Sequence, residues 1–180
     1  MVLRVFQIPV AVAVGVLALV PSPAWAAAPV AACFSSCMKP YAPTSDDYFP
    51  FADHVKACRD RCDAATLDAM RADGSYAAYA SCERAPLDKA DFRALRAANA
   101  SWQSQFNVFL WDVRNVFPDR VLTGITVRTQ DMNLIDVDLE AVGVIPPGAT
   151  GTFVIPDFFD GYPAVRYATK VTSVTACRIK

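Results

Sequence analysis

Six cysteines at regular spacings constrain the fold of this chain more than any other feature. Cys33 and Cys37 stand four residues apart, and Cys58 and Cys62 repeat that interval. Residues at positions i and i+4 of a helix lie on one face, about one turn apart. Two such helices packed antiparallel bring the first cysteine to the last and the second to the third. The spacing therefore predicts a helical hairpin closed by the disulfides Cys33–Cys62 and Cys37–Cys58.

The two remaining cysteines, Cys82 and Cys177, lie in different halves of the chain. Cys82 ends a helix-forming region, and Cys177 falls within the last predicted strand. The number of cysteines is even, and in a chain that is exported, as residues 1–26 described below indicate, all of them are expected to be paired. A third disulfide, Cys82–Cys177, is therefore expected to connect the two halves.

Residues 1–26 have the pattern of a secretory signal peptide. Arg4 precedes an apolar stretch over residues 5–20, and Ala24 and Ala26 supply small residues at the two positions that a signal peptidase recognises. Cleavage is expected after Ala26. The mature protein is then placed in the periplasm or outside the cell, because an alanine-rich chain with more arginine than lysine is typical of bacteria.

The same N-terminal stretch is too short to anchor the protein. Pro21 and Pro23 interrupt the apolar run before it reaches the about 20 residues that cross a bilayer. We therefore expect no membrane span in the mature form. Residues 30–33 also resemble a lipobox, which leaves lipidation of Cys33 as an alternative.

The charge of the chain argues against nucleic acid as a partner. Its 17 basic and 18 acidic side chains give a formal net charge of −1, so no strong positive field attracts polyanions. The expected partner is another envelope or extracellular protein.

The mature chain changes character near residue 100. Residues 27–100 form the predicted disulfide-bonded helical region, with helices expected over 30–38 and from Pro50 to about Gly74. The second of these places a set of small and apolar residues on one face at steps of three and four: Phe51, Val55, Cys58, Cys62, Ala65 and Ala69. Residues 87–98 fit either a helix or a first strand.

Residues 101–180 are predicted to form a small antiparallel β-sandwich. Val137, Leu139 and Ala141 alternate with acidic residues, as in a strand with one solvated face. Turn residues such as Pro118 and Gly148 separate this strand from its neighbours. The expected strands cover residues 106–116, 121–127, 135–141, 152–155 and 170–179. The predicted fold class is therefore α+β, a disulfide-stapled helical hairpin followed by the sandwich.

Two resemblances accompany this reading. Residues 113–129 and 134–155 resemble the immunoglobulin-like FxLYD-type modules of bacterial envelope proteins, with Asn115 in a V-x-N turn and Gly148 and Phe153 in the later Pro-Gly and Thr/Phe pattern. This resemblance implies a binding or spacer module without catalytic residues. The paired Cys-x3-Cys motifs resemble the hairpins of small mitochondrial intermembrane-space chaperones, which implies the hairpin alone.

His54 is the only histidine in the chain, and it limits the possible chemistry. A zinc site with two histidines is excluded, and a hydrolase or a cysteine nucleophile must use this one residue. We therefore predict a non-enzymatic protein with no cofactor and no metal. The alternative is a thiol-based protein that handles copper or exchanges disulfides through its Cys-x3-Cys pairs, in which His54 activates Cys58 once that cysteine is reduced.

Aromatic residues in predicted loops mark the candidate contact surface. Phe158, Phe159 and Tyr162 fall within six residues of one another, next to Gly161 and Pro163. Large aromatic side chains are costly to leave in water, so they cover either the protein's own core or a partner. We predict that this loop binds the partner.

Overall fold

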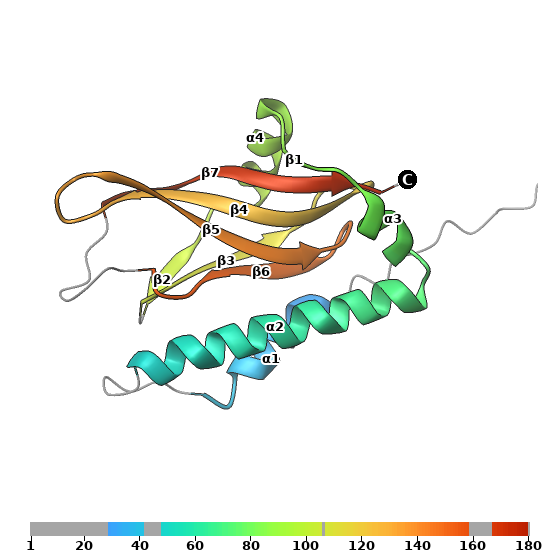
Figure 1. Ribbon diagram of the computed structural model, residues 1–180, viewed down its shortest axis with the longest axis horizontal. Coiled ribbons are helices and arrows are strands. Elements are labelled where there is room, and N and C mark those ends of the chain that lie inside the picture. Colours follow the sequence, from blue (N-terminus) through green and yellow to red (C-terminus); the bar gives the residue numbers. More distant parts are fainter. Residues whose placement is uncertain (1–28, 42–47, 106, 159–166, 180) are drawn as a thin grey trace, which may run out of the picture.

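The computed structural model describes residues 29–41, 48–105, 107–158 and 167–179 of the chain (Figure 1). The predicted signal peptide, residues 1–26, lies outside this part. The helices are α1 (Pro29–Met38), α2 (Tyr48–Ala72), α3 (Tyr76–Ser81) and α4 (Lys89–Ala98), and the strands are β1 (Arg84–Pro86), β2 (Gln103–Gln105), β3 (Val108–Arg114), β4 (Arg120–Gln130), β5 (Asp136–Ile145), β6 (Thr150–Ile155) and β7 (Tyr167–Arg178).

The strands form two antiparallel sheets. A four-stranded sheet has the order β1-β7-β4-β5, and a three-stranded sheet has the order β2-β3-β6. The main core lies between them and includes Phe109, Trp111 and Phe153 from the three-stranded sheet and Ile125 and Val174 from the four-stranded sheet. The predicted α+β class, with helices first and antiparallel sheets after them, is confirmed.

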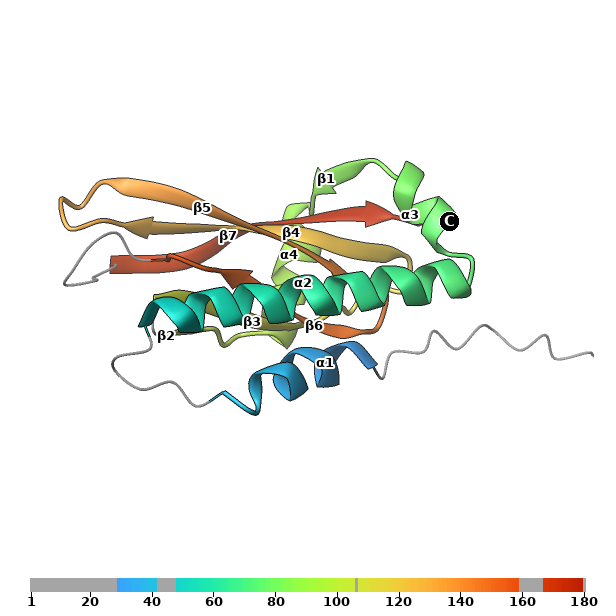
Figure 2. The ribbon, with the colours of Figure 1, turned by 60° about the horizontal axis from the view of Figure 1, so that its bottom comes forward.

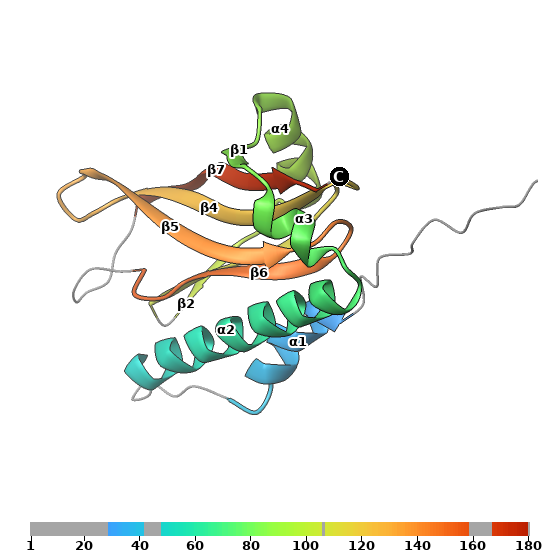
Figure 3. The same cartoon turned by 45° about the vertical axis from the view of Figure 1, so that its right-hand side comes forward.

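The N-terminal helices form the predicted hairpin. The disulfides Cys33–Cys62 and Cys37–Cys58 join α1 to α2, with Cα atoms 5.8 and 5.7 Å apart. Both are the pairs that the i, i+4 spacing predicts. The hairpin packs on the outer face of the three-stranded sheet, where Phe34, Val55 and Val154 share a second apolar cluster. Figures 2 and 3 show α1 and α2 on this side of the sandwich, with α2 running along its length.

Helix α2 also covers the edge of the four-stranded sheet. β5 is the last strand of that sheet, so the outward backbone groups of its edge have no partner strand in the ranges that the structure describes. The carboxylate of Asp63 on α2 accepts a hydrogen bond from the Val144 backbone N–H at 3.3 Å. A helix side chain thus replaces a missing strand at this edge.

The third disulfide fixes the end of the helical region to the last strand. After α2 the chain turns at Gly74, whose φ of +83° is readily adopted by glycine. α3 follows, and Cys82 at its end is bonded to Cys177 on β7. Met70, Tyr79 and Val121 pack around this bridge in a third apolar cluster.

Residues 87–98 contain a helix, which resolves the ambiguity left by the sequence. Asp88 caps α4, since its side chain accepts hydrogen bonds from the backbone N–H groups of Ala90 and Asp91 at 2.9 Å. Leu95 is fully buried in the core between the sheets. Asn99, just after the helix, bonds β3: its Nδ2 donates to the Arg114 carbonyl at 3.0 Å and its Oδ1 accepts from the Arg114 N–H at 2.7 Å.

Asn115 organises the turn between β3 and β4 from a buried position. Its side chain is 1% exposed. Nδ2 donates to the carbonyls of Arg120, Ile145 and Pro146 at 2.7, 2.9 and 3.0 Å, and Oδ1 accepts from the Phe117 N–H at 3.0 Å. One side chain therefore connects the β3–β4 turn to the β5–β6 turn.

Candidate functional site

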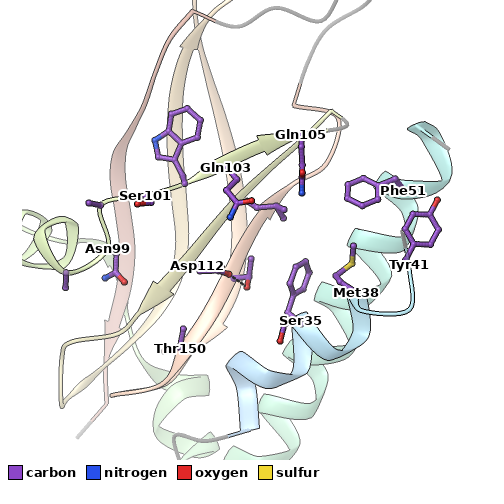
Figure 4. A pocket seen from close by; sticks show the side chains of 16 residues that line it. Ser35, Met38, Tyr41, Phe51, Asn99, Ser101, Gln103, Gln105, Asp112 and Thr150 are labelled. Atoms are coloured by element: carbon purple, nitrogen blue, oxygen red, sulfur yellow. Dashed lines mark hydrogen bonds between the residues drawn. The ribbon is translucent and has the colours of Figure 1, made fainter. Parts of the chain in front are cut away.

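A groove of about 930 Å³ lies between the hairpin and the three-stranded sheet (Figure 4). Its lining comes from α1 and the adjoining parts of the hairpin, from the segment between α4 and β2, and from all three strands of the sheet. The lining residues are Phe34, Ser35, Met38, Tyr41, Phe51, Ala98, Asn99, Ala100, Ser101, Trp102, Gln103, Gln105, Leu110, Asp112, Thr150 and Thr152.

The groove exists because the outer face of the three-stranded sheet changes from apolar to polar along its strands. Leu110 on β3 is paired with Val154 on β6, and the hairpin packs against both residues. The next outward pair is Asp112 with Thr152. The hairpin buries the apolar half, because covering charged and hydroxyl groups without new partners is costly. The polar half becomes the floor of the groove.

Strand β2 forms the rim opposite the hairpin. Gln103 is paired with Leu110 and Gln105 with Val108, so both glutamines face the same side of the sheet as the groove floor. Figure 4 shows Gln103 and Gln105 across from Met38 and Ser35, with Asp112 between them. All three residues of β2 are exposed, so the rim offers amide donors and acceptors to a ligand.

Among the described residues that line the groove, Asp112 is the one with a charged side chain. Its Oδ1 accepts a hydrogen bond from Thr152 Oγ1 at 2.6 Å, which orients the carboxylate. The other lining groups are hydroxyls, amides, aromatic rings and a thioether. The groove therefore favours a ligand that combines apolar surface with hydrogen-bonding groups and a positive charge.

The second group of candidate residues is a cysteine–histidine cluster in the hairpin. Ligand atoms of Cys37, Cys58 and His54 all lie within 4.8 Å of one another. The two cysteines form a disulfide, so the thiolate that the sequence-based alternative requires is absent from this state. The His54 ring stacks on Tyr41 with centroids 4.8 Å apart.

The predicted contact loop is corrected at Phe158. This residue is 1% exposed and packs in the main core, with its ring centroid 5.3 Å from that of Phe109. Its backbone N–H donates to the Asn107 carbonyl at 2.8 Å, which holds the segment against the sheet. Phe158 therefore covers the protein's own core, which is the alternative that the sequence left open for this loop. Phe159 and Tyr162 lie outside the described residues.

The groove itself was not predicted from the sequence. Its residues come from segments far apart in the chain, and they are brought together by the strand register and by the hairpin. The one available signal was the break in apolar alternation on β3, where Asp112 follows Leu110 at the next outward position. This break marks the point along the strand at which the hairpin stops covering the sheet.

Comparison of the chain with known protein families, with curated proteins and with solved structures finds no match. The immunoglobulin-like and hairpin resemblances therefore stay predictions.

None of the helices in the described ranges is both long and apolar enough to cross a membrane.

Proposed function

We propose that this protein is a non-enzymatic binding module of the periplasm or the extracellular space, and that its groove binds an extended peptide segment of a partner protein. The three disulfides support an oxidising compartment, where such bonds persist. Among the described residues, the groove lining holds several hydroxyls but no histidine to activate them. This composition supports binding rather than covalent catalysis.

The groove is the observation that carries the proposal. Its volume of about 930 Å³ falls within the range typical of ligand sites, about 300–1,000 Å³. It is bounded by covalently fixed elements, because two disulfides hold α1 on α2. A preformed site of this kind avoids the cost of ordering its walls on binding.

The shape and the rim of the groove favour an extended chain. β2 is paired with β3 on one side only and forms the edge of its sheet. An extended peptide can add to such an edge through main-chain hydrogen bonds, with alternate side chains facing the groove floor. The glutamines of β2 then lie beside these side chains.

Asp112 gives the proposed site its selectivity. A lysine or arginine side chain that enters the groove pairs with this carboxylate, and such charge-assisted hydrogen bonds are stronger than neutral ones. An acidic side chain in the same place is repelled and loses its hydration. The preferred partner segment therefore alternates apolar and basic residues.

The proposal is tested with two blocked hexapeptides titrated into isotopically labelled protein and followed by NMR. A peptide of alternating valine and lysine is expected to shift the amide signals of β2 and β3 and of the last turn of α1. The matching valine and glutamate peptide is expected to bind at least about tenfold more weakly, which corresponds to about 1.4 kcal/mol.

Two substitutions distinguish binding in the groove from general charge attraction between the protein and the peptide. Asp112→Asn is expected to weaken binding of the lysine peptide by about fivefold to tenfold, because one charge-assisted hydrogen bond is lost. Asp138→Asn is the control, because Asp138 lies on β5 in the other sheet, where it pairs with Arg128 at 2.6 Å. Equal effects of the two substitutions, or signal shifts confined to other surfaces, would refute the proposed site.

A further inference from the structure

The cysteine–histidine cluster in the hairpin contains three atoms that could bind a metal ion once its disulfide is reduced. Cys58 is fully buried and Cys37 is half-buried near the end of α1. A ring nitrogen of His54 lies within 4.8 Å of both sulfur atoms. Two thiolates and an imidazole at this separation form a three-donor set of soft and intermediate ligands.

The His54 side chain is positioned like a metal-binding histidine, although the described part of the chain offers no bonding partner to its Nε2. Its Nε2 is shielded from solvent and has no hydrogen-bond partner in the part of the chain that the structure describes. Buried polar nitrogens are nearly always bonded, so such an atom calls for a further partner. Stacking on Tyr41 at 4.8 Å fixes the plane of the ring.

The neighbouring disulfide allows the cluster to open without loss of the hairpin. Cys33–Cys62 crosses between the same two helices one turn away from Cys37–Cys58. When only the second bridge is reduced, the first still holds α1 against α2. The two freed sulfurs and His54 then remain on facing surfaces of the hairpin.

We propose that reduction of the Cys37–Cys58 disulfide creates a binding site for Cu(I), formed by the two cysteine sulfurs and a ring nitrogen of His54. The three ligands are not lining residues of the groove, although Tyr41 lines the groove and stacks on His54, and the site does not depend on the proposed peptide binding. Cu(I) is the favoured ion because it is soft and accepts thiolate ligands readily. Structural zinc takes four ligands, and the cluster within the described residues contains three.

The reductant in this step is a dithiol, and the reaction balances. One thiolate of the dithiol attacks Sγ of Cys37, the less buried of the two cysteines, and Cys58 leaves as a thiolate. The second thiol of the reductant then displaces Cys37 and forms a disulfide within the reductant. Two electrons and two protons pass to the protein, and Cu(I) replaces the two thiol protons when it binds to the sulfurs and the neutral imidazole.

The test measures Cu(I) affinity in the mature protein under anaerobic conditions, after limited reduction with dithiothreitol and its removal, with peptide mapping to show that Cys37–Cys58 is open and Cys33–Cys62 is intact. Bicinchoninate competes for the ion and reports the free concentration. The wild-type protein is expected to hold one Cu(I), and the variant Cys37→Ser/Cys58→Ser to bind it at least about a hundredfold more weakly. Cys82→Ser/Cys177→Ser is the matched control, with affinity within about threefold of wild type, because both sulfurs of the cluster and the Cys33–Cys62 bridge remain.

Two further measurements assign the nitrogen ligand. His54→Ala is expected to lower the affinity about tenfold or more, and X-ray absorption of the wild-type Cu(I) protein is expected to show two sulfur neighbours and one nitrogen. The absorption result stands even if the histidine variant fails to fold. Equal losses in the two cysteine-pair variants, or coordination by sulfur alone, would overturn the proposal.

Discussion

Replacement of Asn115 by alanine is expected to lower the free energy of unfolding by about 3–4 kcal/mol. The substitution removes four side-chain hydrogen bonds and leaves three carbonyls and the Phe117 N–H inside the protein without that partner. Each buried group left unpaired costs about 1–3 kcal/mol, and local relaxation recovers part of the sum. Urea unfolding of the disulfide-intact protein, followed by circular dichroism, measures the difference.

A second substitution distinguishes hydrogen bonding from packing. Asn115→Asp keeps nearly the same volume and retains an acceptor for Phe117, but it removes the two donors and adds a charge. If the carbonyl bonds matter, this variant is at least as unstable as the alanine variant. A mild effect of aspartate would instead show that the side chain acts mainly by filling space. Asn133→Ala, at an exposed turn position, is the control and should change stability by less than about 0.5 kcal/mol.

Replacement of Asp63 by asparagine is expected to raise the free energy of unfolding near pH 7.5 by about 2–3 kcal/mol. Burial where α2 packs against β5 raises the pKa of this carboxyl from 3.8 to about 6, against the opposing effects of the Val144 N–H and of Arg59. The folded protein therefore pays to ionise Asp63 at neutral pH. Asparagine is uncharged at every pH, and its carbonyl oxygen still accepts the Val144 N–H.

The pH dependence identifies the cause of this gain. A folded-state pKa above the unfolded value means that the folded state binds the proton more tightly. The contribution of Asp63 to stability is thus fully present below about pH 3.8 and is lost as the pH rises through about 6. The difference between wild type and Asp63→Asn should grow across that window and be small near pH 3.5. A difference that is constant with pH would contradict the assignment.

Asp60→Asn provides the matched control on the same helix. Asp60 lies on the exposed side of α2, and its hydrogen bond to Arg59 lowers its pKa. Its small contribution has the opposite sign, being present at neutral pH and lost as the pH falls. The two variants, three positions apart, should therefore give pH profiles of opposite slope.

The parts of the fold that the sequence predicted are those governed by short-range periodicity. The pairing of Cys33 with Cys62 and of Cys37 with Cys58 follows from the helical repeat, and both bridges are present. The longer strands were predicted from the alternation of apolar and polar residues. β1 and β2 were missed, because three-residue edge strands with exposed side chains carry no such pattern.

The candidate site depends on long-range arrangement and was not predictable in the same way. The groove requires the register of β2, β3 and β6 together with the position of the hairpin on the sheet, and no local pattern encodes that combination. At Phe158, by contrast, a local pattern suggested a contact surface where the structure has a core residue. The residues around Phe158 have the composition of a surface loop. Asp157 nevertheless adopts a left-handed backbone conformation, the Phe158 N–H bonds to the Asn107 carbonyl, and the Phe158 side chain lies in the core.

The Cys82–Cys177 bridge has a consequence for the covalent integrity of the protein. The bridge spans 95 positions and encloses every strand from β1 through most of β7, so this part of the chain is a covalent ring. A protease that cuts once within the ring opens it but releases no fragment, and the cut halves stay docked through the sheets. A second cut frees the piece between the two cleavage sites, and reduction of this one bond separates the two halves. A single nick at any exposed turn of the sandwich should therefore release no fragment on a non-reducing gel, and two fragments should separate only after reduction.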